Sequence, residues 1–260
     1  MDQPLMLESR PVATGTRMLG AYLPVPGLGI LPVNAFVITA EQPVLIDTGL
    51  AALREDFMAQ LEATVDLTTL RWIWLTHMDP DHIGNLRVVL EKAPQAQVVT
   101  NFLGAGKMGL LQLPVERVHL LEAGQRLDVG DRELLAIAPP CFDAPETLGV
   151  FDTRTRALFS ADCFGALMQG PAEVAAEITP GDLREGLATW SMVDAPWLSL
   201  VQRDELALAC EPLRTLEPEQ VLSSHLPPAL GMLAPLTQYL LGVAGGGQRG
   251  PVPVNGQRAG

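Results

Sequence analysis

The sequence predicts one globular domain of the mixed α/β (α+β) class. The chain has 260 residues, enough for one large domain or two small ones with a sizeable core. Its hydrophobic content of 48% fits a well-packed interior. Short apolar runs of strand length, bounded by Gly and Pro, alternate with segments whose apolar residues recur at helical spacing. We expect a single domain over residues 1–243.

The N-terminal part is predicted to be mostly β-structure. Residues 16–24 and 34–39 are apolar runs of strand length, and the Pro and Gly residues at 25–32 predict an interruption between them. A third apolar run, residues 44–49, reads as a buried strand that ends in an Asp-Thr-Gly turn. The apolar residues of 51–64 then follow helical spacing.

The central part alternates between strands and helices before it becomes β-rich. The predicted elements are a strand at 70–75, a helix at 84–92, a strand at 97–100, a short helix at 105–111, and a β-meander at 117–138 with turns at Gly124 and Gly130-Asp131.

The C-terminal part begins with a predicted hairpin and then turns helical. Strands at 148–152 and 157–160 are followed by mostly helical residues at 181–216 and by a strand at 221–225, and a last helix ends near Val243. Residues 244–260 hold six Gly and no aromatic residue, so we expect a disordered tail there.

Composition excludes several classes of protein. The net charge of −13 argues against nucleic-acid binding, which needs clustered Lys and Arg. The N-terminus lacks the basic and apolar regions of a signal peptide, and no apolar run is long enough to span a membrane. A cytoplasmic protein without membrane contact is expected. The three cysteines, Cys141, Cys163 and Cys210, are too few and too widely spaced for a disulfide framework.

The stretch Trp-Ile-Trp-Leu-Thr-His-Met-Asp-Pro-Asp-His-Ile-Gly, residues 72–84, carries the clearest chemical signal. Its apolar start leads into four potential metal ligands: His77, Asp79, Asp81 and His82. Imidazole and carboxylate suit zinc, iron or manganese, and the lack of thiolates argues against a closed structural zinc site. The whole chain has only four histidines, so two of them in one such loop favour a metal site over chance.

Three further polar residues, Asp143, Asp162 and His225, lie at or just past the ends of apolar runs. Taken singly, Asp162 could be a helix cap or turn residue, and His225 a hydrogen-bonded loop histidine. If these segments converge, they form a buried polar cluster whose unpaired charges each cost on the order of several kcal/mol without a cation.

Taken together, the seven residues resemble the metallo-β-lactamase superfamily, most closely its flavodiiron and related di-iron oxygen-binding branch. Most hydrolases of the superfamily carry His-x-His-x-Asp-His, whereas the di-iron branch has a carboxylate at the second His, as at Asp79 here. The segment Asp-Ala-Pro-Glu-Thr from Asp143 resembles that branch's His-Trp-Pro-Asp-Ser, residues 158–165 resemble its strand with the bridging Asp, and Ser-Ser-His225 resembles its last ligand. The resemblance covers roughly residues 12–230.

This resemblance implies an αββα sandwich, two back-to-back β-sheets flanked by helices, with a dinuclear metal site along its edge. It further implies that Asp47 supports the site by hydrogen bonds without binding metal. The implied ligands are His77, Asp79 and Asp143 for one metal, Asp81, His82 and His225 for the other, and Asp162 as the bridge.

Two departures from the family pattern matter. Asp143 stands where the family has His, so four carboxylates and three neutral imidazoles supply a charge of −4, which balances two divalent ions. The extra carboxylate favours iron or manganese over zinc, or else it marks a weakened first position. In addition, no flavodoxin-like domain follows the last ligand, so any reductase activity is expected to need an external electron-transfer partner.

Three functions fit this pattern. The first is a di-iron protein that binds or reduces O₂ or NO, as a sensor, a carrier or a partner-fed reductase. The second is a metal-dependent hydrolase of an ester, lactone or phosphoester, in which metal-bound water would be the nucleophile. The third is a non-catalytic binding protein with a degenerate site. In each case we expect a small-molecule ligand and, from the family's habit, a homodimer.

Other candidates carry weaker signals. Cys141 and Cys163 adjoin expected ligands but read as buried core thiols, with a redox role as the alternative. His119 lies in an apolar run and reads as structural. Aromatic and Met residues of the region 164–197, namely Phe164, Trp190, Met192 and Trp197, are expected in the core or at the pocket wall.

Overall fold

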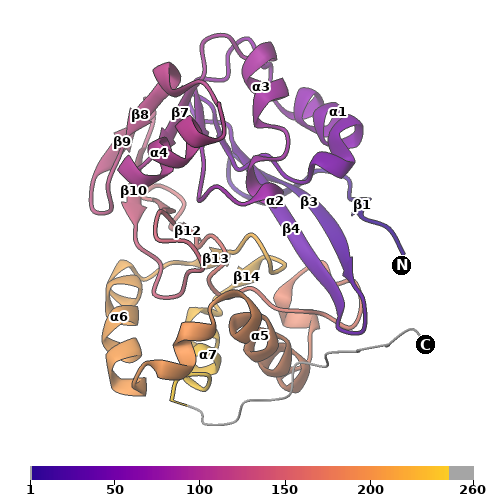
Figure 1. Cartoon of the computed structure of the whole chain (residues 1–260), viewed down its shortest axis with the longest axis vertical. Coiled ribbons are helices and arrows are strands. Elements are labelled where there is room, and N and C mark those ends of the chain that lie inside the picture. Colours follow the sequence, from indigo (N-terminus) through magenta and orange to yellow (C-terminus); the bar gives the residue numbers. More distant parts are fainter. Residues whose placement is uncertain (1, 246–260) are drawn as a thin grey trace, which may run out of the picture.

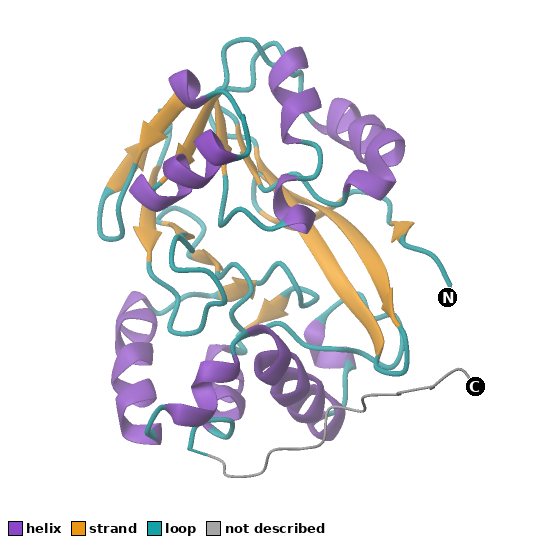
Figure 2. Ribbon diagram, viewed as in Figure 1, coloured by secondary structure: helices purple, strands orange, loops and turns teal. Residues whose placement is uncertain are grey.

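Two β-sheets stacked face to face, with helices on both outer faces, make up the computed structural model, which describes residues 2–245 (Figures 1 and 2). The helices α1, α3 and α4 lie on one side of the sheets, and α5, α6 and α7 lie on the other. This arrangement confirms the expected αββα sandwich. Of the expected tail, Ala244 packs partly buried against the core, and residues 246–260 lie outside the described residues.

The first sheet combines antiparallel and parallel pairing. Its order is β1-β3-β4-β5-β6-β7-β8, and β2 pairs with β3 off this path. Pairing is antiparallel from β1 to β5 and parallel from β5 to β8. The strands are β1 (Leu5–Met6), β2 (Arg10–Ala13), β3 (Thr16–Val25), β4 (Gly29–Ile38), β5 (Val44–Ile46), β6 (Trp72–Trp74), β7 (Gln97–Thr100) and β8 (Val118–Leu120).

The second sheet has six strands in the order β14-β13-β12-β11-β10-β9. Only β12 and β13 run parallel; the other neighbours are antiparallel. The strands are β9 (Arg126–Asp128), β10 (Glu133–Ile137), β11 (Gly149–Asp152), β12 (Ala157–Phe159), β13 (Gln220–Leu222) and β14 (Ala229–Leu230).

The helices are short to medium in length. They are α1 (Arg54–Thr64), α2 (Pro80–Ile83), α3 (Leu86–Lys92), α4 (Phe102–Leu110), α5 (Pro180–Asp194), α6 (Arg203–Leu216) and α7 (Leu233–Leu241). Single 3₁₀ turns occur at Ala51–Leu53, Val115–Arg117, Ala175–Glu177 and Pro196–Leu200. Within residues 2–245, no helix has the length and apolar character that crossing a membrane would require.

The alternation of side chains along each strand separates three core layers. In β6, Trp72 and Trp74 face the space between the sheets, whereas Ile73 faces the layer under α1, α3 and α4. In β12, Phe159 likewise points between the sheets and Leu158 points toward α5, α6 and α7. Since every central strand is buried on both faces, these strands read as continuous apolar runs in the sequence.

The predicted interruption at residues 25–32 is wrong. β3 and β4 form one long hairpin paired from Thr16↔Ile38 to Val25↔Gly29. A tight turn is sufficient because Gly27 and Gly29 adopt positive φ angles of 77° and 109°. Of the two Pro residues in that range, Pro26 lies in the turn and Pro32 lies within β4, where it pairs with Tyr22.

The predicted meander at 117–138 is correct only for its second half. β9 and β10 pair as neighbours in the second sheet, but β8 lies parallel to β7 at the edge of the first sheet. The chain therefore crosses between sheets near Gly124, whose positive φ of 89° marks the turn. The last predicted strand also ends earlier than expected, at Leu222, which leaves His225 in a loop, and the short strand β14 was not predicted.

Candidate metal centre

The potential ligands gather where strands from both sheets end. Asp47 follows β5, and the loop after β6 carries His77 and leads into α2. In the second sheet, Asp162 follows β12 and His225 follows β13. β5 and β6 are parallel, and so are β12 and β13. The loops that follow the two strands of each pair therefore begin at the same edge of their sheet.

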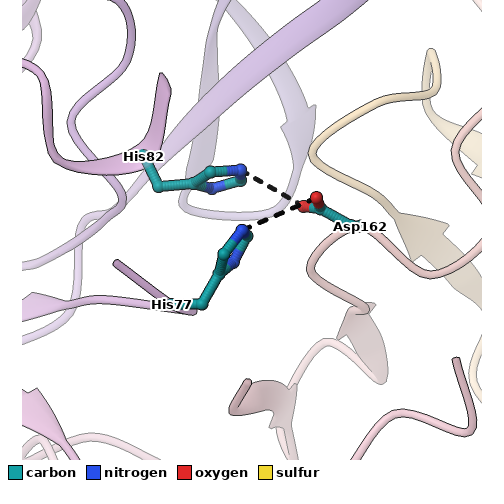
Figure 3. Close-up of side chains that lie close together, drawn as sticks. All are labelled: His77, His82 and Asp162. Atoms are coloured by element: carbon teal, nitrogen blue, oxygen red, sulfur yellow. Dashed lines mark ion pairs between the residues drawn. The ribbon is translucent and has the colours of Figure 1, made fainter. Parts of the chain in front are cut away.

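Asp162 faces several imidazoles, and Figure 3 shows those of His77 and His82 pointing toward its carboxylate. Its Oδ1 is 3.2 Å from His82 Nε2, and its Oδ2 is 3.2 Å from His225 Nε2 and 3.6 Å from His77 Nε2. Asp81 Oδ2 is 3.6 Å from His82 Nε2 and 3.5 Å from His225 Nε2. One carboxylate therefore faces three imidazoles from two separate segments, the one after β6, which carries His77 and His82, and the one after β13, which carries His225.

The donor atoms fall into groups of the size that a metal ion needs. In one group, His77, Asp79 and Asp143 bring ligand atoms within 4.8 Å of one another. In a second group, Asp81, His82 and His225 do the same, and a third joins His77 and His82 to Asp162. All seven ligands suggested by the sequence thus come together, with Asp162 between the two outer groups. Asp143, which stands where the family has His, also lies in this cluster.

Each of the three imidazoles is held by its Nδ1 atom and presents Nε2 to the cluster. His82 Nδ1 is 2.8 Å from Asp47 Oδ2, His225 Nδ1 is 2.7 Å from the Pro32 carbonyl oxygen, and His77 Nδ1 is 3.1 Å from Thr76 Oγ1. Fixing one ring nitrogen so that the other can bind is the usual arrangement around protein-bound metals.

Several buried polar atoms of the cluster lack hydrogen bonds among the described residues. These are Nε2 of His77, His82 and His225, and one oxygen each of Asp143 and Asp162. Buried groups of this kind are normally paired, and leaving each unpaired costs about 1–3 kcal/mol. No Lys or Arg forms an ion pair with these carboxylates in residues 2–245. The donor set therefore fits metal ions, which would satisfy all of these atoms together.

The pKa shifts show how strongly the groups of the cluster act on one another. Burial alone would raise the pKa of Asp162, but the charges of His225, His82 and His77 hold it well below its usual value. Burial would lower the pKa of His225, yet the Asp162 carboxylate raises it to about 9. Burial raises the pKa of Asp79 and, together with the charge of Asp162, that of Asp143. The buried carboxylates thus oppose one another's ionisation, and the imidazoles favour it.

Asp47 organises the ligand loop without belonging to the groups of potential ligands. Its Oδ1 accepts a hydrogen bond from the Thr76 backbone N–H at 2.8 Å, and its Oδ2 accepts one from Thr76 Oγ1 at 2.7 Å. The same Oδ2 holds His82 Nδ1. Asp47 adopts a positive φ of 58°, a conformation that Asp and Asn tolerate better than most residues. The expected supporting role agrees with these contacts.

Replacing Asp47 with Asn tests that role. Asn keeps the left-handed turn but exchanges one acceptor oxygen for an N–H donor, so the hold on His82 weakens. We expect the affinity for metal to fall by about 10–100-fold, the usual loss for such supporting partners. Titration against a chromogenic chelator measures this. Asp66→Asn, at an exposed turn that also binds a Thr hydroxyl, is the matched control; equal affinities in both variants would contradict the role.

Sequence reasoning missed one residue of the cluster, Asp194. This last residue of α5 brings a carboxylate oxygen within 4.8 Å of ligand atoms of Asp143 and Asp162. Burial and the charges of Asp162 and Asp143 raise the pKa of Asp194 to about 7. No local motif marks it, because it approaches the site through the packing of a helix and not from a strand end.

Two tryptophans of the same region contact the cluster or a segment that carries one of its residues. Trp190 lies one turn before Asp194 on α5, with its ring centroid 4.9 Å from that of His225. The Trp190 indole Nε1 is buried and has no hydrogen-bond partner among the described residues. Trp197 donates its indole N–H to the Phe142 carbonyl at 2.7 Å and so supports the segment that carries Asp143.

The remaining candidates are His119, which packs in the core, and the three cysteines, which are buried. His119 stacks edge-to-face against Trp72, with ring centroids 5.2 Å apart, as expected for a structural residue. Cys141, Cys163 and Cys210 are free and buried. Burial raises the pKa of the Cys163 thiol well above its usual value, so this thiol is protonated near neutral pH.

An αββα sandwich with this ligand cluster at its edge defines a protein of metallo-β-lactamase fold with a candidate dinuclear metal centre. The family model "ODP family beta lactamase" matches residues 31–225, which include every residue of the cluster. The chain belongs to that family. The resemblance read from the seven residues is thereby confirmed.

Known proteins with similar sequences are flavoproteins. The anaerobic nitric oxide reductase flavorubredoxin of Pectobacterium carotovorum is 31% identical over 134 residues, which is 51% of this chain and 27% of that protein. The chain spans less than a third of the length of the curated relatives it matches, for example 23% and 32%.

Two solved structures share the fold. The metal-soaked Flv1 flavodiiron core from Synechocystis sp. superposes with a TM-score of 0.75 and 21% identity, covering 92% of this chain and 62% of that one. Rubredoxin oxygen:oxidoreductase from Desulfovibrio gigas superposes with a TM-score of 0.79 and 17% identity, covering 90% and 61%.

Proposed function

We propose that the cluster binds two metal ions bridged by Asp162. His77, Asp79 and Asp143 would hold the first ion, and Asp81, His82 and His225 would hold the second. The observation that carries this proposal is the set of imidazoles fixed through Nδ1 whose buried Nε2 atoms converge, without hydrogen bonds, on one carboxylate. Asp47 would support the second position through His82.

We further propose that the metals are iron and that the protein binds or reduces O₂ or NO. Carboxylate-rich ligand sets with imidazole suit iron and manganese. Support comes from two similar proteins, of which one is a nitric oxide reductase and the other a rubredoxin oxygen:oxidoreductase. When bound, iron would supply electrons to the small molecule. The residues of this chain would fix the two ions at one distance and shield them from bulk water.

The supply of electrons belongs to the same proposal. In this proposal a redox partner would deliver electrons to the centre. We also propose that the protein works in the cytoplasm and forms a homodimer, the commonest symmetric assembly.

Mixing the reduced, iron-loaded protein with NO or O₂ tests the proposed chemistry. The protein is loaded with Fe²⁺ under anaerobic conditions, freed of excess reductant and mixed with each gas. We expect rapid oxidation of iron: two Fe²⁺ would reduce two NO to one N₂O and one water, and the four Fe²⁺ of two chains would reduce one O₂ to two waters. Gas chromatography and an oxygen electrode measure the products and the consumption.

His119→Asn, which changes the one histidine outside the cluster, is the matched control and is expected to react like the unchanged protein. Slow oxidation at the rate of free Fe²⁺, identical with and without the protein, would contradict the proposal. Hydrolysis of a lactone or phosphoester by the zinc-loaded protein, with no reaction of the iron form, would replace it with metallohydrolase activity.

A further inference from the structure

Asp194 occupies a position that is unfavourable for a carboxylate unless a cation lies beside it. It is the last residue of α5, where the helix dipole places partial negative charge. It is partly buried, and its oxygen lies within 4.8 Å of the ligand atoms of two other carboxylates, Asp143 and Asp162. Helix end, burial and like charges all oppose ionisation here.

The packing of α5 fixes Asp194 at this place. Gly186 brings the helix against the backbone of Leu167, whose N–H donates to the Gly186 carbonyl at 3.2 Å. Thr179 caps the N-terminus of α5, and the buried Ala195 ends the helix through a hydrogen bond to the Ser191 carbonyl. The carboxylate therefore approaches the centre from a rigid element and not from a loop tip.

An independent observation indicates a ligand on the side where Asp194 lies. His77 is fully buried, and its Nε2 has no hydrogen-bond partner among the described residues. This atom lies 3.9 Å from Asp143 Oδ1 and 3.6 Å from Asp162 Oδ2, the two carboxylates that neighbour Asp194. A buried imidazole nitrogen that faces two carboxylates of the Asp143, Asp162 and Asp194 group without a hydrogen bond favours a cation on that side of the centre.

We propose that Asp194 is a further ligand of the first metal ion, an inference that rests on the dinuclear centre proposed above. The first position then has one imidazole and the carboxylates of Asp79, Asp143, Asp194 and the bridging Asp162. The second position keeps two imidazoles. The two positions therefore differ in hardness, and the first takes a hard cation such as Mn²⁺ or Fe³⁺.

A fifth carboxylate changes the total charge that the ligand side chains supply. Asp194 adds a fifth carboxylate to the four that the sequence indicated, so the ligands supply −5 with neutral imidazoles. Two divalent ions would leave one negative charge over, and one divalent with one trivalent ion would balance it fully. The centre would therefore accept two divalent ions and favour a pair with one ion more oxidised, which the first position would hold.

Binding of Mn²⁺ to metal-free protein tests the assignment without using activity. We expect the unchanged protein to bind two Mn²⁺ ions, with the exchange-coupled electron paramagnetic resonance signal of a close pair. In Asp194→Asn, the affinity of one position is expected to fall at least about tenfold, a lower bound taken from losses of supporting partners. The paired signal then gives way to that of a single ion, which a merely structural role would not produce.

Two further variants make the outcome decisive. Glu185→Gln removes one negative charge from the exposed side of the same helix and is expected to bind like the unchanged protein. Asp194→Glu keeps a carboxylate and is expected to retain the second Mn²⁺, which separates loss of a ligand from loss of folding. Unchanged affinity of both positions in Asp194→Asn would overturn this assignment alone. Fewer than two Mn²⁺ in the unchanged protein would overturn the dinuclear centre as well.

Discussion

Asp162→Asn is expected to abolish the binding of both metal ions. The Asp162 carboxylate lies 3.2 Å from the free nitrogens of His82 and His225 and 3.6 Å from that of His77, so both proposed positions depend on it. Asn has the same shape but supplies one neutral oxygen and a donor that repels a cation. We expect iron content to fall from about two ions per chain to less than half an ion.

Inductively coupled plasma mass spectrometry of the purified variant measures this loss. Far-ultraviolet circular dichroism, compared with metal-free unchanged protein, confirms that the variant is folded. His119→Asn is the matched control, because it removes the only imidazole that lies outside the cluster. An Asp162→Asn protein that keeps two tightly bound ions would show that Asp162 is not the bridge.

Gly186→Ala is expected to cause the largest loss of stability among the helical glycines. A Cβ atom at Gly186 would lie 2.0 Å from the Leu167 carbonyl oxygen, which is backbone and cannot rotate away. α5 must therefore shift away from the Leu167 backbone, and Trp190 and Asp194 would move with it. Overpacking of this kind costs about 3 kcal/mol, or more where the backbone must move.

Denaturant unfolding of metal-free protein measures the change. Gly181→Ala on the same helix is the matched control, since a Cβ there meets only Thr179 Oγ1 at 3.9 Å. Alanine is also the better helix former, so the control is expected to be neutral or to gain up to about 1 kcal/mol. Equal stabilities of the two variants would show that the close approach at Gly186 carries no cost.

The sequence located the residues of the cluster better than it located the strands. The positions of residues at strand ends, such as Asp162, can be read from the local sequence. Where an apolar run stops, the next polar residue lies at the edge of the sheet. The resemblance then supplied the pairing of distant segments, which periodicity cannot. The position of Asp143 in the cluster follows from the same spacing, although its residue type departs from the family.

The errors have physical causes. Pro26 and Pro32 suggested a break, but Pro26 lies in the turn of the hairpin, next to glycine residues with positive φ, and Pro32 is tolerated in its second strand. β8 was assigned to the wrong sheet because strand pairing depends on tertiary contacts that neighbouring residues do not encode. Asp194 was missed for a related reason. Its approach to the centre results from the packing of α5 on Leu167, which leaves no motif in the sequence.

The most direct test of the proposed centre is the metal content of protein purified without added metal, together with its visible spectrum in air and after dithionite. The dinuclear iron centre predicts about two irons per chain and an oxo-to-iron charge-transfer band that bleaches on reduction. Two zinc ions with a featureless spectrum would contradict the redox function and leave a hydrolytic site. One ion or none would contradict the dinuclear centre itself.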